Sequence, residues 1–380
     1  MQIDYSKRIF GLDIMRAVAI LLVVFSHTLW IVPGAKGLIP DLLSLAGVIG
    51  VEIFFVLSGF LIGRIVFKLF TQDDFNFNKI KYFWIRRLFR TLPNYYLILL
   101  VNIFIAVFLG TELPENLWLY FLFMQNFAWE MPLFFSESWS LPIEEFAYII
   151  GPLLLYLLFY FKVKTDKKKL FAIITISIIL FFNITKIIYN MANSDSDMMF
   201  WNVNLKAITI YRIDAIYYGV LASYFAMINP KKWQRSSWLS FTIGALIFGV
   251  LNFIIPTQRV FIETHSFFWN VLYLPINSIA IAFCLPLLSL LKSAPKLILV
   301  PVTYISLISY SMYLLHYSIV LQLLKYYIPS DGLAKFDIFV YTSVYLITTI
   351  LLSYILYRIY EKPMMDIRDK PFVLERFNKK

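Results

Sequence analysis

The 380-residue sequence has a single cysteine, Cys284, and charged residues make up only 15% of it. One cysteine cannot form a disulfide framework or a multi-cysteine metal site, so cysteine chemistry is not expected. The low charge accompanies 60% hydrophobic residues and a mean hydropathy of +0.74, which is too apolar for an ordinary soluble protein. The composition predicts a polytopic membrane protein.

Hydrophobic runs in the sequence predict about ten membrane spans. A helix that crosses a hydrocarbon core needs about 20 mainly apolar residues. Runs that reach or approach this length cover residues 9–32, 46–67, 92–109, 143–161, 170–189, 207–228, 237–255, 267–291, 298–324 and 337–357. The segment 113–141 has only about a dozen apolar residues in its longest run, so we expect a re-entrant or interfacial segment there. The predicted fold is all-α, with residues 1–380 forming a single integral-membrane domain.

Lysine and arginine gather on one side of these spans, as they do on the cytoplasmic side of membrane proteins. With the N-terminus inside, the basic runs at 79–90, 162–169 and 231–235 all fall on the inner side. An even number of spans then places both termini in the cytoplasm. The formal net charge of +11 is mostly this topology signal together with contact with anionic membrane lipid, and it does not predict a nucleic-acid partner. No cleavage site follows the first span, so we expect it to stay in the cell membrane.

The first span contains the ionisable residues Arg16 and His27, whereas a purely structural helix is expected to carry none. Eleven residues separate them, so at about 100° per residue they lie on nearly the same face, roughly 16 Å apart along the axis. Because a charge at mid-membrane costs about 2.5–3.5 kcal/mol, we expect both to face a protein-lined or watery cavity. With the N-terminus inside, Arg16 is nearer the cytoplasm and His27 nearer the outer face. The alternative is a buried polar pair that only locks helices together.

Seven segments together form a family pattern. They read GLDIMRAVAILLVVFSH at 11–27, GVEIFFVLSGFLIGRI at 50–65, FWIRRLFRTLPNYY at 83–96, ESWSLPIEEFAYIIGPLLL at 137–155, YRIDAIYYGVLA at 211–222, ISYSMYLLHYSIV at 308–320 and YEKP at 360–363. In this order the sequence resembles the acyltransferase-3 family of membrane acyltransferases. The resemblance implies transfer of an acyl group, most often acetyl from acetyl-CoA, to a hydroxyl of a cell-surface or secreted carbohydrate. It also implies a multi-pass protein of the bacterial cytoplasmic membrane.

Transfer from a thioester to a hydroxyl needs a base near that hydroxyl, and an imidazole, with its ordinary pKa around 6.5, suits proton removal near neutral pH. We therefore predict that His27 is the general base; an acyl-histidine intermediate is the alternative. Glu144 and Glu145 open the fourth span near the outer face. Glu144 stands at the family position after the WSL motif and could orient His27, as the acid does in a triad. These carboxylates could instead complement the helix dipole. Arg16 completes the predicted catalytic set.

The donor implied by the resemblance is cytoplasmic and carries phosphates. Arg86, Arg87 and Arg90 stand where the third span begins on the inner face. Arginine pairs bidentately with phosphate, so we predict that these three bind acetyl-CoA, with Arg87 and Arg90 carrying the family motif. We expect the pantetheine arm to pass Arg16 on its way to His27. The alternative is that basic residues simply collect at an inner helix end.

Further polar side chains are predicted at a depth similar to that of His27. The candidate acceptor-binding residues are Trp139, Ser140, Glu145, Arg212, Asp214, Tyr313 and His316. Arg212 and Asp214 could instead form an internal ion pair, and His316 could be a hydrogen-bonded core residue. The resemblance implies a carbohydrate or glycolipid acceptor, reached directly or through a separate extracytoplasmic transfer partner, and no metal. A transporter or exporter that uses intramembrane polar residues is the alternative function, but it has no need of the WSL segment.

Overall fold

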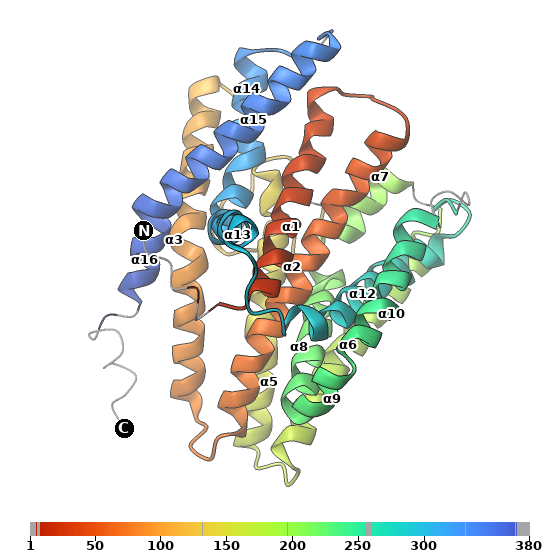
Figure 1. The fold of residues 1–380 in the computed structure, drawn as a ribbon, viewed down its shortest axis with the longest axis vertical. Helices are drawn as coiled ribbons and strands as arrows, with labels where there is room; N and C mark the ends of the chain where they lie inside the picture. Colours follow the sequence, from red (N-terminus) through yellow and green to blue (C-terminus); the bar gives the residue numbers. More distant parts are fainter. Residues whose placement is uncertain are drawn as a thin grey trace.

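A computed structural model describes residues 5, 8–130, 132–195, 197–254, 260–330, 332–368 and 370. Within these residues the chain is helical without strands, and the helices form an elongated bundle (Figure 1). Eight helices are long and apolar enough to cross a membrane, and two shorter apolar helices, Ile213–Ile228 and Ser237–Phe253, occupy the sixth and seventh predicted spans. The prediction of an all-α polytopic membrane protein is confirmed. The ends that we predict in the cytoplasm, 1–4 and 371–380, lie outside the described residues.

The main helices follow the predicted spans in order. They are α1 (Phe10–Ser26), α2 (Leu38–Thr71), α3 (Phe77–Leu109), α5 (Ser140–Tyr160), α6 (Lys167–Ala192), α8 (Ile213–Ile228), α10 (Ser237–Gly249), α12 (Tyr273–Leu288), α13 (Lys296–Leu315) and α15 (Lys335–Leu356). Short helical pieces extend or connect them: η2 (His27–Ile31), α4 (Trp118–Phe121), η3 (Ser136–Trp139), α7 (Met198–Trp201), η4 (Asn202–Lys206), η5 (Thr209–Tyr211), α9 (Pro230–Arg235), η6 (Val250–Ile254), η7 (Phe268–Leu272), η8 (His316–Leu321), α14 (Gln322–Tyr327), η9 (Tyr357–Glu361) and α16 (Lys362–Ile367).

Helices α1 and α13 lie side by side and run in the same direction. Near the start of α1, Arg16 Nη1 donates to Ser306 Oγ at 3.3 Å, and just after its end His27 Nδ1 lies 3.3 Å from His316 Nε2. The contact that lies later in α1 also lies later in α13, so the two helices are parallel. The first and ninth of ten spans must be parallel, and the predicted shared face of Arg16 and His27 is the face that packs against α13.

Hydrogen bonds between loops show that alternate loops meet, as a chain that crosses back and forth requires. Lys167 Nζ donates to Gln72 O at 2.5 Å, which joins the loop before α6 to the loop after α2. At the opposite end, Lys325 Nζ donates to Trp30 O at 2.8 Å, which joins the end of α14 to the loop after α1. The first of these contacts lies among the basic runs that we predict on the cytoplasmic side.

The segment between α3 and α5 is not a membrane span. Apart from α4 and η3 its described residues form no helix, and it is held against the bundle by Asn126, which is buried. Asn126 Nδ2 donates to Trp139 O at 2.8 Å, and Asn126 O accepts from Thr209 N at 2.9 Å. Several predicted boundaries move, and two of these shifts bear on the site. Helix α3 begins at Phe77, because Asn76 caps it by accepting from Lys79 N at 3.2 Å, whereas α8 begins only at Ile213.

Helices α2 and α8 approach each other closely. A Cβ atom on Gly59 would overlap the carbonyl oxygen of Ile216, and one on Gly219 would overlap that of Val56. Small residues let membrane helices approach closely, where van der Waals packing and weak polar contacts stabilise them. The close packing of α2 against α8 fixes the position of α8. It thereby also fixes the turn from η4 to η5, which borders the site described next.

Candidate functional site

Two polar cavities adjoin inside the bundle. We call the larger one, with a volume of about 590 Å³, the outer cavity, and the smaller one, with about 140 Å³, the inner cavity. The polar residues that line the outer cavity include Ser26, His27, Asp41, Ser44, Glu137, Asn202 and Lys206. Those of the inner cavity include Arg16, Ser58, Arg87, Arg90, Thr91, Ser140, Glu144 and Ser309. Val51 and Tyr313 line both, so they mark the junction.

Two hydrogen bonds of the Tyr313 hydroxyl hold this side chain at the junction. It donates to the backbone oxygen of Glu137 at 2.5 Å and lies 2.6 Å from Ser140 Oγ, which donates to it. Both partners belong to the turn that leads from η3 into α5, so α13 is tied to the WSL segment. Of the predicted acceptor-binding residues, Ser140 and Tyr313 thus lie at the junction, and Trp139 lines the outer cavity.

The hydrogen bonds of His27 assign its tautomer. Its Nδ1 lies 2.8 Å from the carbonyl oxygen of Val23, which can only accept, so Nδ1 carries the proton. The Nδ1 of His316 is protonated for the same reason, because it lies 2.8 Å from Tyr313 O. Its Nε2 is therefore unprotonated and is an acceptor that faces His27 Nδ1. The other nitrogen of His27, Nε2, is unprotonated and has no hydrogen-bond partner among the described residues. His27 lines the outer cavity and can act there as a base.

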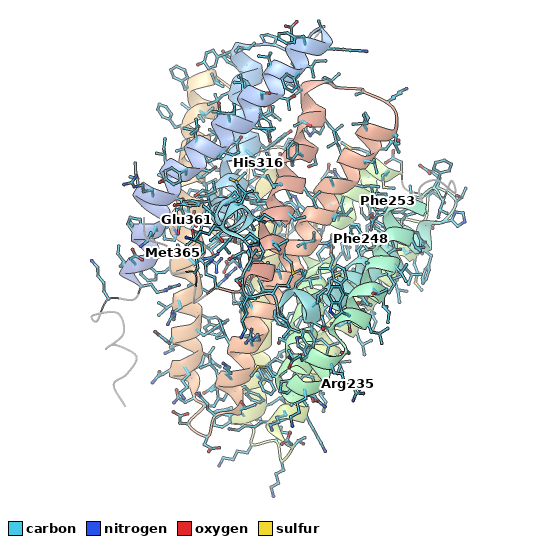
Figure 2. The ribbon with its side chains drawn as sticks, viewed as in Figure 1. Arg235, Phe248, Phe253, His316, Glu361 and Met365 are labelled. Carbon is cyan, nitrogen blue, oxygen red and sulfur yellow. The ribbon has the colours of Figure 1, made fainter. Side chains whose placement is uncertain are left out.

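His316 is fully buried, and it lies in the upper part of the bundle in Figure 2. It begins η8, a π-helical turn inserted where the regular helix α13 ends. Turns of this kind place one extra residue in the helix and occur often at functional sites. The next residue, Tyr317, also reaches His27, with the ring centroids 4.8 Å apart. His316 and Tyr317, two consecutive residues of η8, therefore fix the position of the His27 imidazole.

Glu144 does not have the role predicted for it beside His27. Its Oε1 accepts from Ser58 Oγ at 2.8 Å and its Oε2 accepts from Arg87 Nη2 at 2.9 Å, within the inner cavity. The described structure contains no hydrogen bond between Glu144 and His27, so the predicted orienting contact is wrong. The reason is the early start of α3, which brings Arg87 alongside Glu144 and Tyr148 of α5.

The carboxylate that does reach the outer cavity is Glu137, in η3. Its Oε1 accepts from Ser318 N at 3.0 Å and from Ser318 Oγ at 2.6 Å, so it holds the turn that contains His316. Sequence reasoning did not single it out because it lies in an irregular segment, although it is the first residue of the ESWSL motif. Glu145, predicted to bind the acceptor, is buried and lines neither cavity.

Three of the predicted arginines, Arg16, Arg87 and Arg90, line the inner cavity. Arg86 does not line it; its Nη1 donates to the hydroxyl of Tyr82 at 3.1 Å on the exposed side of α3. One carboxylate lines this cavity beside the three guanidinium groups. The inner cavity therefore presents an excess of positive charge, and its geometry suits a ligand with anionic or carbonyl oxygens.

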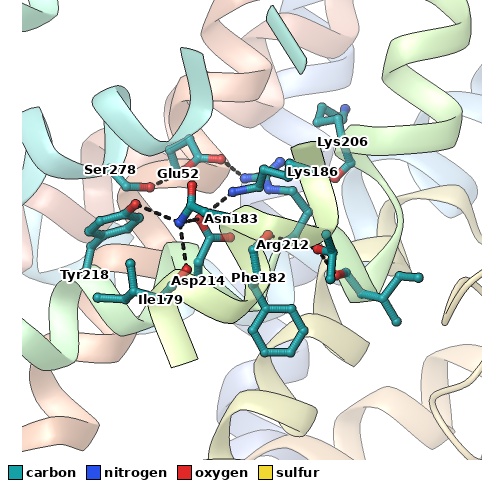
Figure 3. A network of polar contacts seen from close by, with 12 residues as sticks. Glu52, Ile179, Phe182, Asn183, Lys186, Lys206, Arg212, Asp214, Tyr218 and Ser278 are labelled. Atoms are coloured by element: carbon teal, nitrogen blue, oxygen red, sulfur yellow. Dashed lines mark hydrogen bonds and ion pairs between the residues drawn. The ribbon is translucent and has the colours of Figure 1, made fainter. Parts of the chain in front are cut away.

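Arg212 and Asp214 lie in two buried ion pairs (Figure 3). Arg212 pairs with Glu52 of α2, and Asp214 pairs with Lys186 of α6. None of the four side chains lines the outer or inner cavity, so this placement does not support the predicted acceptor contact. Arg212 and Asp214 are therefore each paired with a residue of another helix and not with each other. The two pairs join α2 and α6 to the start of α8.

Lys206, in η4, is the cation of the outer cavity. Its Nζ lies 4.6 Å from the ring centroid of Trp139, and burial lowers the pKa of Lys206 from 10.5 to about 8. Its backbone oxygen accepts from Arg212 Nη1 at 3.2 Å, so the buried ion pair helps to place it. The sequence offers no signal for this lysine, because its position depends on the irregular turn before α8.

The fold and the site together define an integral-membrane protein that encloses two adjoining polar cavities, one lined by His27 and one by arginine. The chain belongs to the Acyltransferase domain family, which matches residues 9–358. The predicted family is therefore confirmed over nearly the whole sequence.

Relatives carry names consistent with this family. The chain is 28% identical over 335 residues to peptidoglycan O-acetyltransferase OatA of Listeria monocytogenes, a match that covers 83% of this chain and 50% of OatA. It is 27% identical over 381 residues to a Staphylococcus aureus protein provisionally named an O-acetyltransferase, covering 93% of this chain and 56% of that protein. The chain thus spans about half the length of these curated relatives. No solved structure matches it.

Proposed function

We propose that the protein is a membrane-bound O-acyltransferase that moves an acetyl group from cytoplasmic acetyl-CoA to a hydroxyl of a cell-surface carbohydrate or its lipid-linked precursor. The observation that carries this proposal is the adjacency of an arginine-lined cavity and a cavity with a histidine base, with Val51 and Tyr313 lining both. An acyl group that enters on one side can meet a hydroxyl on the other at this junction. The names of the relatives support acetyl as the group transferred.

In the proposed reaction, His27 Nε2 takes the proton of the acceptor hydroxyl while that oxygen attacks the thioester carbonyl carbon. The new C–O bond forms, the C–S bond breaks, and the proton passes from His27 to the departing thiolate. The ammonium of Lys206, in the same cavity, would stabilise negative charge on the carbonyl oxygen. His316 Nε2 accepts from His27 Nδ1 and so stabilises the imidazolium that forms.

The donor would use the inner cavity for its reactive end only. A volume of about 140 Å³ holds a thioester and part of the pantetheine arm rather than a nucleotide. Arg87 is already paired with Glu144, whereas Arg90 is exposed and makes no hydrogen bond or ion pair with the described residues. We therefore assign Arg90 to the phosphates at the mouth of the cavity, and Arg16 to the thioester end.

The walls of the outer cavity suit a saccharide. Four indole rings, those of Trp30, Trp139, Trp201 and Trp269, line it together with the polar groups given above. Flat aromatic faces with a few placed polar groups bind and orient polar ligands that have apolar ring faces. The name of the Listeria relative supports a wall glycan as acceptor.

The test uses the purified protein, acetyl-CoA labelled in the acetyl group, and isolated wall or surface glycan. The proposal predicts label on the glycan, with Arg90→Gln raising the KM for acetyl-CoA and Arg235→Gln, a matched change far from both cavities, leaving it unchanged. Absence of acetyl-CoA binding by well-folded protein would overturn the proposal. Mass analysis of surface glycans from a deletion strain would then identify the acceptor.

A further inference from the structure

A third cavity lies apart from the two described above. It is a groove of about 390 Å³ between α8, α10 and α12, bounded at one end by α9. It shares no lining residue with the outer or inner cavity. Helix α9 lies at the lower end of the bundle in Figure 1, on the side predicted to face the cytoplasm. The groove is therefore separate from the cavities that we assign to the two substrates of the proposed reaction.

The walls and the end of this groove differ in polarity. Leu221, Phe225 and Phe283 form apolar walls, and the two phenylalanine rings are 57% and 38% exposed. In a membrane-spanning bundle such exposure faces hydrocarbon, so the groove opens sideways to the bilayer. At the α9 end the lining becomes polar, with Asn229 and Lys232. A groove with apolar walls and one polar end matches the shape and polarity of a single amphipathic lipid.

The segment of chain that forms the polar end carries charge of only one sign. No aspartate or glutamate occurs between Asp214 and Glu263, whereas Lys231, Lys232 and Arg235 lie in or next to α9. The ammonium of Lys232 makes no hydrogen bond or ion pair with the described residues. Figure 2 shows Arg235 at this same lower end of the molecule. A ligand that brings a negative charge to Lys232 at the membrane surface would complete the site.

We propose that this groove binds an anionic glycerophospholipid, with its phosphate at Lys232 and an acyl chain along α8 and α12. The lining residues of α8 run from Tyr218 to Phe225, which is about 10 Å of helix, enough for a good part of one chain. The end of the groove at Tyr218 reaches the buried ion-pair network. The hydroxyl of Tyr218 accepts from Asn183 Nδ2 at 3.1 Å, and Asn183 contacts Asp214 in the buried network of Figure 3.

The test is lipid retention by the full chain in mild detergent, measured by native mass spectrometry with phosphatidylglycerol and phosphatidylcholine of the same chain length. A basic residue near an anionic surface changes affinity by about fivefold. Lys232→Gln should therefore lower phosphatidylglycerol retention by about fivefold. Lys231→Gln is the matched control, because it makes the same charge change on a neighbouring exposed residue that does not line the groove. Ala282→Trp, which fills the groove, should reduce retention of both lipids.

Three outcomes would overturn the proposal. Equal retention of the two lipids by the unaltered protein would show an unselective apolar groove. An equal loss for Lys231→Gln and Lys232→Gln would show only a diffuse basic surface. Unchanged retention in folded Ala282→Trp protein would place the lipid elsewhere. Because Lys232 is exposed and lies outside both polar cavities, its substitution tests lipid binding without testing acyl transfer.

Discussion

His316 Nε2 lies 3.3 Å from His27 Nδ1, and both imidazoles donate their Nδ1 protons to backbone carbonyls. The proposed base is thus supported by a second, neutral imidazole where hydrolytic triads use a carboxylate. A neutral partner needs no counter-charge in a buried site, which fits the fully buried position of His316. The pair comes from two parallel helices, so it depends on the packing of α1 against α13.

Substitution of His316 should impair the chemical step rather than donor binding. His316→Leu leaves His27 Nδ1 with the Val23 carbonyl alone and removes the second acceptor that faces it, and we expect kcat to fall by about a hundredfold, within the usual contribution of acid–base catalysis. His316→Gln keeps an acceptor oxygen and should recover part of the rate. His265→Leu is the matched control, because this histidine is exposed in a loop. Equal rates for the Leu and Gln variants, at equal amounts of folded protein, would contradict the positioning role.

Glu144 should act through the donor and not through His27. Its partners are Ser58 and Arg87, so Glu144→Gln disturbs the inner cavity. We expect a higher KM for acetyl-CoA, by about tenfold, with a smaller change in kcat. Steady-state kinetics with varied donor concentration measures both. A loss of about 10⁴-fold in kcat at unchanged KM, the result for the orienting acid of a triad, would contradict this placement.

The Arg212–Glu52 pair should matter for stability. Arg212→Met leaves the Glu52 carboxylate buried and unpaired except for Ser278 Oγ, which donates to it at 2.8 Å. Breaking a buried ion pair on one side costs about 3–5 kcal/mol, so the thermal midpoint in detergent should fall clearly. The double variant Arg212→Met with Glu52→Leu should recover much of the loss. Normal stability with weakened acceptor binding would instead restore the acceptor-binding role predicted from the sequence.

Because of Lys206, the rate of the reaction should depend on pH in the alkaline range. Burial lowers its pKa from 10.5 to about 8, so the folded protein loses this ammonium as pH rises through 8. Between pH 8 and 10.5 the unfolded chain binds more protons at this site, so its contribution to stability rises with pH while the charge in the outer cavity disappears. We expect Lys206→Arg to retain activity at pH 9, where the unaltered protein has lost part of it. Parallel pH profiles for the two proteins would rule out a role for this charge.

The spans could be predicted from the sequence because hydropathy and basic loops follow directly from the bilayer. The shared face of Arg16 and His27 could also be predicted, since it depends only on the period of one helix. The partners of Glu144 could not be predicted, because the position of α3 relative to α5 along the membrane normal depends on where α3 begins. Glu137 and Lys206 were missed for a related reason: both lie in short irregular turns whose course is set by packing against the bundle.

The central claim, that His27 is the base of an acyl transfer, is tested most directly by His27→Ala in purified protein, with labelled acetyl-CoA and glycan in a single turnover. The account predicts that acetyl-CoA binding stays within about twofold while transfer falls by about 10²–10⁴-fold. Transfer at the unaltered rate by folded His27→Ala protein would contradict it.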